Sequence, residues 1–70
     1  MNKYTKSFAE NLKDLIGETT ISEFAEKVKI PQPTISRYLS CQRQITFDNL
    51  VALADYFDIS IDVLIGRKDY

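Results

Sequence analysis

Side chains able to make paired hydrogen bonds stand close together between Gln32 and Arg37. The amide of Gln32 offers a donor and an acceptor side by side, and the guanidinium of Arg37 offers a planar fork of donors. Either group can bind one planar partner through two parallel hydrogen bonds, which suits recognition rather than bond breaking. Each also has a plainer interpretation, since Gln32 could cap a helix and Arg37 could be a solvated surface charge.

Groups suited to catalysis or metal binding are scarce in the 70 residues. The chain has no histidine and one cysteine, Cys41, whereas zinc sites use several Cys and His ligands and a nucleophilic thiol needs a nearby base. The acids occupy scattered cap and surface positions, and no glycine-rich phosphate loop is present. The sequence therefore predicts that the protein is not an enzyme, binds no metal and no cofactor, and has no evident small-molecule site.

The charges are unevenly distributed, although the formal net charge is only −1. Residues 27–47 contain four bases and no acid, and residues 48–65 contain four aspartates and no base. A basic middle segment suits a polyanion, whereas the low net charge argues against nucleic acid, because many domains that bind it are strongly basic. Chance clustering on two solvated faces is the alternative. The basic residues are Lys27, Lys29, Arg37 and Arg43.

Length and composition predict one small domain spanning residues 1–70. No apolar run reaches the ~18 residues of a membrane helix, and the N-terminus lacks the apolar core of a secretory signal. A lone cysteine fits a reducing compartment, since it can form no internal disulfide. We therefore expect a cytoplasmic protein with no membrane partner.

Apolar residues recur with the 3.6-residue period of a helix in five separate segments, the fourth beginning at Phe47. Residues typical of helix ends separate them. Thr20 and Glu23 form a capping box, in which Glu23 reaches back to the amide of Thr20, and Pro33 suits a first helical turn. No segment alternates convincingly as a strand, so the sequence predicts an all-α fold. The predicted helices span residues 6–16, 21–28, 33–40, 47–57 and 61–65.

The segment ISEFAEKVKIPQPTISRYLS, residues 21–40, is typical of two short helices joined by a tight turn. Such helices pack at a steep angle and need a small residue where their backbones approach, a place that Ala25 can take. They also need apolar residues between them, for which Phe24, Val28, Ile30 and Ile35 are available. The sequence therefore predicts a helix-turn-helix unit in its middle.

With FAEKV, IPQPTISRYLS and LVALADYFDISIDVLIG, the chain resembles the lambda-repressor/Cro-type (phage-repressor-like) helix-turn-helix family from about Phe8 to Gly66. The resemblance implies a five-helix DNA-binding domain with the helix-turn-helix at its second and third helices. It also implies a sequence-specific transcriptional regulator that binds double-stranded DNA, and we expect a repressor.

Several residues depart from the family pattern. Lys29 and Cys41 stand where the family usually has glycine, and a left-handed conformation at Lys29 would cost about 1 kcal/mol. Ile16 and Leu39 occupy positions where the family often pairs an arginine with a glutamate, and an apolar pair can replace an ion pair as a unit without loss of stability. The connection between the first two helices is about two residues short.

The resemblance places the third helix in the major groove, with its N-terminal residues against base edges. There Gln32 could pair with adenine and Arg37 with guanine, while Pro33 offers only apolar contact, for example with a thymine methyl group. The predicted base contacts are Gln32, Pro33, Thr34, Ser36 and Arg37.

Phosphate contacts are expected beside this helix, from backbone amides at the start of the second helix and from the loop after the third. Ile21 stands where the family often has glutamine, so it can offer only its amide. Tyr38 has two interpretations, a core residue or a hydroxyl that reaches a phosphate. The predicted phosphate contacts are Thr20, Ile21, Ser40, Gln42, Arg43 and Gln44.

The resemblance also implies a homodimer on a near-palindromic operator, whose half-sites lie about 34–36 Å apart. In this family the end of the loop and the fifth helix often meet across the two-fold axis, which here indicates Ile45 and Val63. The alternative is that Val63 is a lone exposed valine, which is common.

A rival hypothesis is a helical protein-interaction module or antitoxin-like domain with the same fold, because a fold does not determine function. The net charge and Ile21 favour it slightly, whereas the acid-free stretch around the third helix favours DNA. Salt-dependent retention on heparin or random DNA separates the two hypotheses, since an interaction module should show neither retention nor a salt slope.

Overall fold

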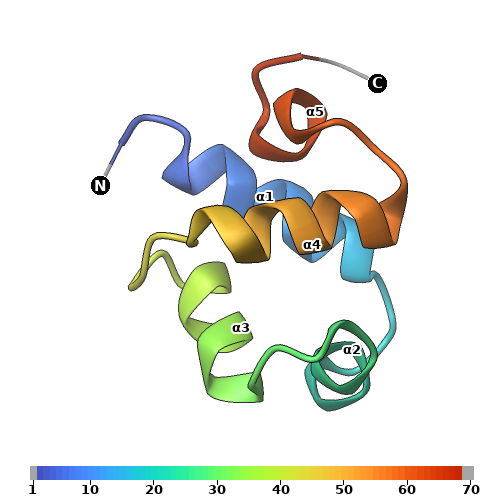
Figure 1. The fold of residues 1–70 in the computed structure, drawn as a ribbon. Coiled ribbons are helices and arrows are strands. Elements are labelled where there is room, and N and C mark those ends of the chain that lie inside the picture. Colours follow the sequence, from blue (N-terminus) through green and yellow to red (C-terminus); the bar gives the residue numbers. More distant parts are fainter. Residues whose placement is uncertain (1, 69–70) are drawn as a thin grey trace.

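The computed structural model describes residues 2–68, and in that range it contains five helices and no strand (Figure 1). Each helix matches one that the sequence predicts, so the all-α architecture is confirmed. Three boundaries differ: the first helix begins one residue earlier than predicted, and the third both begins and ends one residue earlier. The helices are α1 (Thr5–Ile16), α2 (Ile21–Val28), α3 (Gln32–Leu39), α4 (Phe47–Phe57) and α5 (Ile61–Ile65).

The shift of α3 has its cause at Pro31, which is the N-cap residue in an extended conformation. The Pro31 carbonyl already accepts hydrogen bonds from the amides of Thr34 at 3.0 Å and Ile35 at 3.1 Å. The helix therefore begins at Gln32, and Pro33 occupies its second position, where a missing N–H still costs no intrahelical bond. Gln32 is thus a helical residue, and its interpretation as the cap is wrong.

Hydroxyl side chains cap three of the helices. Thr20 Oγ1 accepts from the Glu23 amide at 3.1 Å, Thr46 Oγ1 from Asn49 at 3.2 Å, and Ser60 Oγ from Val63 at 3.2 Å. The second half of the predicted capping box is wrong. The Glu23 carboxylate accepts from the Thr20 hydroxyl at 3.2 Å instead of from its amide, because one hydroxyl can donate and accept at once.

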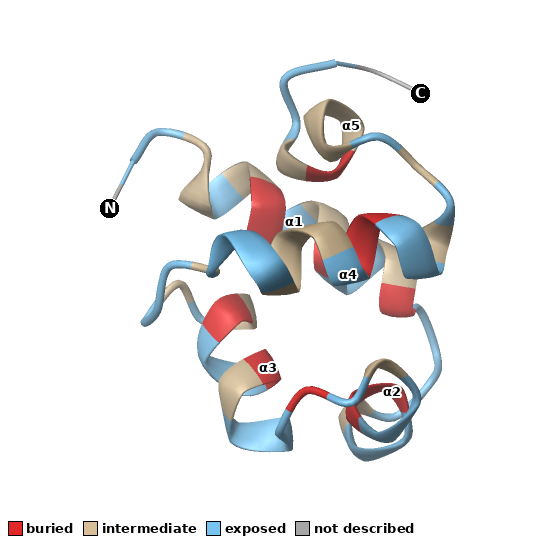
Figure 2. Ribbon diagram, in the orientation of Figure 1, coloured by how far each residue is buried: buried red, intermediate tan, exposed pale blue. Residues whose placement is uncertain are grey.

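The core takes residues from all five helices, and their buried faces turn toward one another (Figure 2). α1 packs against α3 and α5, α2 against α3 and α4, and α4 against α5. One residue of the apolar period lies outside the core: Phe47 is 73% exposed. It is the first residue of α4, and its neighbours Thr46 and Asp48 are exposed too, so the apolar period begins before the part of the helix that the core covers. The fully buried side chains are Leu12, Phe24, Ile35, Tyr38, Leu53 and Leu64, with Phe24 at 2%.

The short helix α5 is tied to α1 by side chains that bond its last carbonyls. Ser7 Oγ donates to the Ile65 carbonyl at 2.7 Å, and Asn11 Nδ2 donates to the carbonyls of Leu64 at 3.2 Å and Val63 at 3.3 Å. Gly66 ends α5 with φ +89°, and a Cβ there would lie 2.9 Å from Ser7 Cβ. These contacts set the orientation of a five-residue helix that could not be stable alone.

Within residues 2–68, three residues other than glycine adopt left-handed backbone conformations: Lys29 (φ 59°), Cys41 (φ 61°) and Asp58 (φ 54°). Each follows a helix, and the next amide bonds back five residues, as from Ile30 to the Ala25 carbonyl at 3.2 Å. This is the hydrogen bond of a helix end that normally uses glycine. Lys29 therefore adopts the left-handed conformation that the family usually gives to glycine, and it bears the steric cost noted above.

We expect Lys29→Gly to raise the free energy of unfolding by about 1 kcal/mol, because glycine adopts this conformation without the steric cost of a Cβ. Thermal unfolding followed by circular dichroism should show Tm rising by roughly 4–8 °C. Lys27→Gly is the matched control, since Lys27 is exposed within α2 and glycine there should cost about 1 kcal/mol. A fall in Tm for both variants would contradict the prediction.

Candidate nucleic-acid interface

The turn between α2 and α3 is held by one buried side chain. Ile30, between left-handed Lys29 and extended Pro31, is 4% exposed and packs in the core. Phe24, Ala25 and Ile35 around it are also buried, and Val28 packs half-buried against them. The predicted packing of the two helices is therefore confirmed, and it fixes the orientation of α3.

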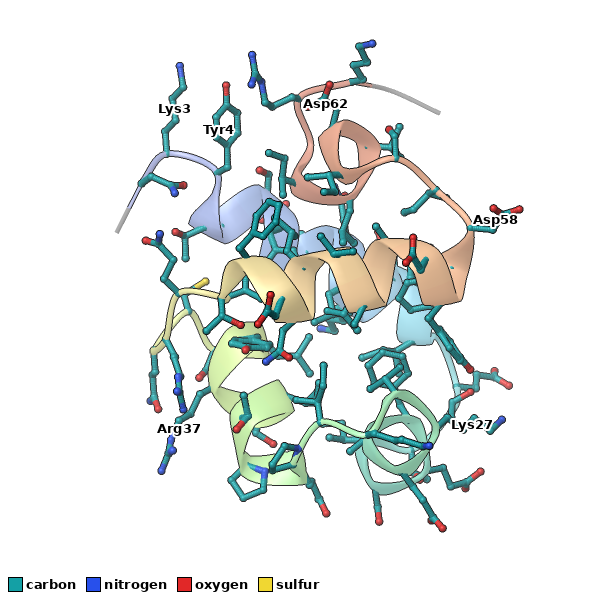
Figure 3. The ribbon with its side chains drawn as sticks, viewed as in Figure 1. Lys3, Tyr4, Lys27, Arg37, Asp58 and Asp62 are labelled. Carbon is teal, nitrogen blue, oxygen red and sulfur yellow. The ribbon has the colours of Figure 1, made fainter. Side chains whose placement is uncertain are left out.

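The outer face of α3 is polar and open to solvent. Because Ile35 and Tyr38 turn into the core, the helical period places the opposite side chains outward. Arg37 extends away from the body of the fold (Figure 3). Of the five predicted base-contacting residues, Gln32, Pro33, Ser36 and Arg37 are exposed and Thr34 is half-buried.

Tyr38 belongs to the core, which decides between its two interpretations. It is 1% exposed, and its ring meets Phe8 edge-on with 6.1 Å between centroids. Its hydroxyl accepts a hydrogen bond from Asn49 Nδ2 at 2.9 Å, so its polar end is satisfied by α4.

The residues predicted to contact phosphate lie on the surface at both ends of the helix-turn-helix. The hydroxyls of Thr20 and Ser40 are already used, since Thr20 caps α2 and Ser40 Oγ donates to the Arg37 carbonyl at 3.3 Å. The donors that remain for an anion at the start of α2 are therefore its free backbone amides, which lie beside the carboxylate of Glu23. Thr20, Ser40, Gln42, Arg43 and Gln44 are exposed and Ile21 is half-buried.

A hollow opens where the end of α1, the start of α2 and the side of α3 meet; we call it the α1–α3 hollow. It brings together Ile21, Ser36 and Ser40, which the sequence separates but assigns to the same surface. Ile16 and Leu39 both line it, so the apolar pair expected to replace an ion pair forms part of one wall. The hollow is lined by Lys13, Ile16, Gly17, Thr19, Ile21, Ser36, Leu39 and Ser40.

Lys13 is the residue of this surface that sequence reasoning missed. In the sequence it is one exposed lysine on the polar side of α1. Its place beside Ser36 depends on how α1 packs against α3, a contact between segments more than twenty residues apart. No local pattern signals such a contact.

Comparison with known proteins decides the family. A family model described as helix-turn-helix matches residues 17–64, more than half of the chain and the whole of α2, α3 and α4. The chain belongs to the lambda-repressor/Cro-like helix-turn-helix family. It is thus a DNA-binding helix-turn-helix regulator in the general sense of that family, whose members are generally not enzymes. No curated protein sequence and no solved structure matches the chain.

The helix-turn-helix match ends within α5, where the predicted dimer contact Val63 lies. Leu64 is fully buried, and Ile61 and Ile65 pack half-buried against the core. Val63 is half-buried but does not belong to that packed set. Ile45, the other predicted dimer contact, is half-buried and packs against the core.

Within residues 2–68, no helix has the length and apolar character to cross a membrane.

Proposed function

We propose that residues 1–70 form one DNA-binding domain of a sequence-specific repressor that inserts α3 into the major groove. The observation that supports this most is the division of α3 into two faces. Ile35 and Tyr38 anchor one face in the core, and the other presents Gln32, Ser36 and Arg37 to solvent. A recognition helix needs one buried face and one exposed polar face, because the side chains that contact bases must be held on a rigid element.

In this proposal the exposed face of α3, from Gln32 to Arg37, contacts bases and the flanking segments contact phosphates. The amide of Gln32 matches the N6 and N7 edge of adenine, and the guanidinium of Arg37 matches O6 and N7 of guanine. Pro33 contacts apolar groups such as a thymine methyl. The amides at the start of α2 and the loop residues Gln42–Gln44 hold the backbone and set the register.

A single short helix reads few base pairs, so we propose that two copies bind a near-palindromic operator with half-sites about 34–36 Å apart. Ile45 and Val63 are the proposed contacts between the copies. Val63 supports this because it is the apolar residue of α5 that is not packed into the core. A repressor of this kind acts by occupying the operator and excluding other proteins from it.

A second candidate is a protein-interaction module, and two exposed aromatic residues favour it. Phe47 is 73% exposed and Tyr56 is 46% exposed, and the chain carries a net charge of −1. Exposed aromatic side chains are enriched at protein interfaces. Such a module would use α4 rather than the polar face of α3.

Selection of bound sequences from a random duplex pool separates the two candidates. We expect recovery of a site with two inverted half-sites, and an affinity whose logarithm falls linearly with the logarithm of salt concentration. Failure to enrich any sequence, together with no retention on random DNA at low salt, would contradict the proposed function.

A further inference from the structure

The α1–α3 hollow has the composition of a binding site, although no sequence motif marks it. Ile16, Ile21 and Leu39 supply apolar surface, of which Ile16 is 8% exposed and the other two are half-buried. Lys13 is exposed at its edge, and none of its lining residues is acidic. The hollow therefore combines an apolar floor with one positive charge.

The position of the hollow identifies what it could hold. Ile21 and Ser40 are proposed phosphate contacts and Ser36 a proposed base contact, so the hollow is continuous with the proposed DNA surface. It lies between the start of α2 and the side of α3, where the strand flanking an inserted α3 must pass. That strand presents its sugars and phosphates outward, whereas its bases face the groove.

We propose that the α1–α3 hollow seats one sugar–phosphate unit of the DNA backbone, with the Lys13 ammonium on the phosphate and the apolar floor against the deoxyribose. This inference rests on the proposed DNA binding and adds Lys13 as a positioning residue. The alkyl stem of lysine can lie along Ile16 while its charged end reaches the rim. An arginine–glutamate pair at residues 16 and 39 would present polar atoms here, whereas Ile16 and Leu39 make the floor of this hollow apolar.

Lys13→Gln tests the proposal through the salt dependence of binding to the selected operator. Losing one phosphate contact should make the negative slope of log affinity against log salt shallower by about one, with base preference unchanged. Lys13→Arg should keep the slope. Lys27→Gln is the matched control: it removes the same charge from a position beside Glu23 and Glu26, on the side of α2 away from α3 (Figure 3), and should leave the slope unchanged.

Operator duplexes that carry a single neutral methylphosphonate at successive positions locate the contact. A methylphosphonate at one position should lower the affinity of the parent protein but not that of Lys13→Gln. At the other contacted positions it should lower the affinity of both proteins equally. If Lys13→Gln keeps the parent slope and loses sensitivity at no position, the hollow holds something other than the backbone, such as an apolar ligand or partner segment, and the proposal is overturned. If the parent itself shows no salt-dependent binding to DNA, the proposed function fails and this inference fails with it.

Discussion

Arg37→Ala is expected to weaken binding to the selected operator by about 1–3 kcal/mol, roughly 5- to 150-fold, and to relax the preference at one base pair. Arg37 is exposed on the outer face of α3, one turn after Gln32 and Pro33. Its guanidinium can make two hydrogen bonds to guanine that an alanine leaves unmade. Titration of the operator and of duplexes altered at each position in turn measures both effects.

Two variants control for charge in this experiment. Arg43→Ala removes a loop arginine and should weaken all sequences alike, lowering the salt slope by about one. Arg37→Lys keeps the charge and should keep the slope, but it should lose the preference for guanine, since a lysine lacks the planar fork. A changed site preference in Arg43→Ala with none in Arg37→Ala would show that α3 docks in another register.

Val63→Asp is expected to abolish cooperative binding, so that the variant binds the two-half-site operator no more tightly than it binds one half-site. A buried like-charge pair across the two-fold axis would oppose association of the copies. The helix should persist, because residue 63 lies in the first turn of α5, where an acidic side chain interacts favourably with the helix dipole. Footprinting on one and two half-sites measures cooperativity, and circular dichroism checks the fold.

Ala52→Asp is the matched control for that variant. Ala52 is exposed on α4, so the change adds the same charge at a surface outside α5. Both variants should bind a single half-site with equal affinity, and Ala52→Asp should keep cooperativity. Tight binding of Val63→Asp to the full operator would remove α5 from the dimer surface.

The helices of this protein were predictable because their signals are local. Thr20, Thr46 and Ser60 each cap the helix that follows by bonding an amide three residues away. The apolar period selects the buried face within each segment in the same way. The polar outer face of α3 follows directly, since the burial of Ile35 and Tyr38 leaves the opposite side to solvent. Capping and periodicity act within one or two turns, so the sequence alone carries them.

What only the tertiary structure decided involves contacts between segments far apart in the chain. The apolar period of α4 begins at Phe47, but the packing of the helices leaves this residue exposed. Tyr38 is satisfied by Asn49 of α4, and the carbonyls that end α5 are satisfied by Ser7 and Asn11 of α1. Lys13 joins Ser36 and Leu39 at one hollow only because α1 packs against α3. The spacing of apolar residues along the sequence specifies which face of each helix is apolar. How the five helices pack together decides which partner covers that face and which polar groups lie beside it.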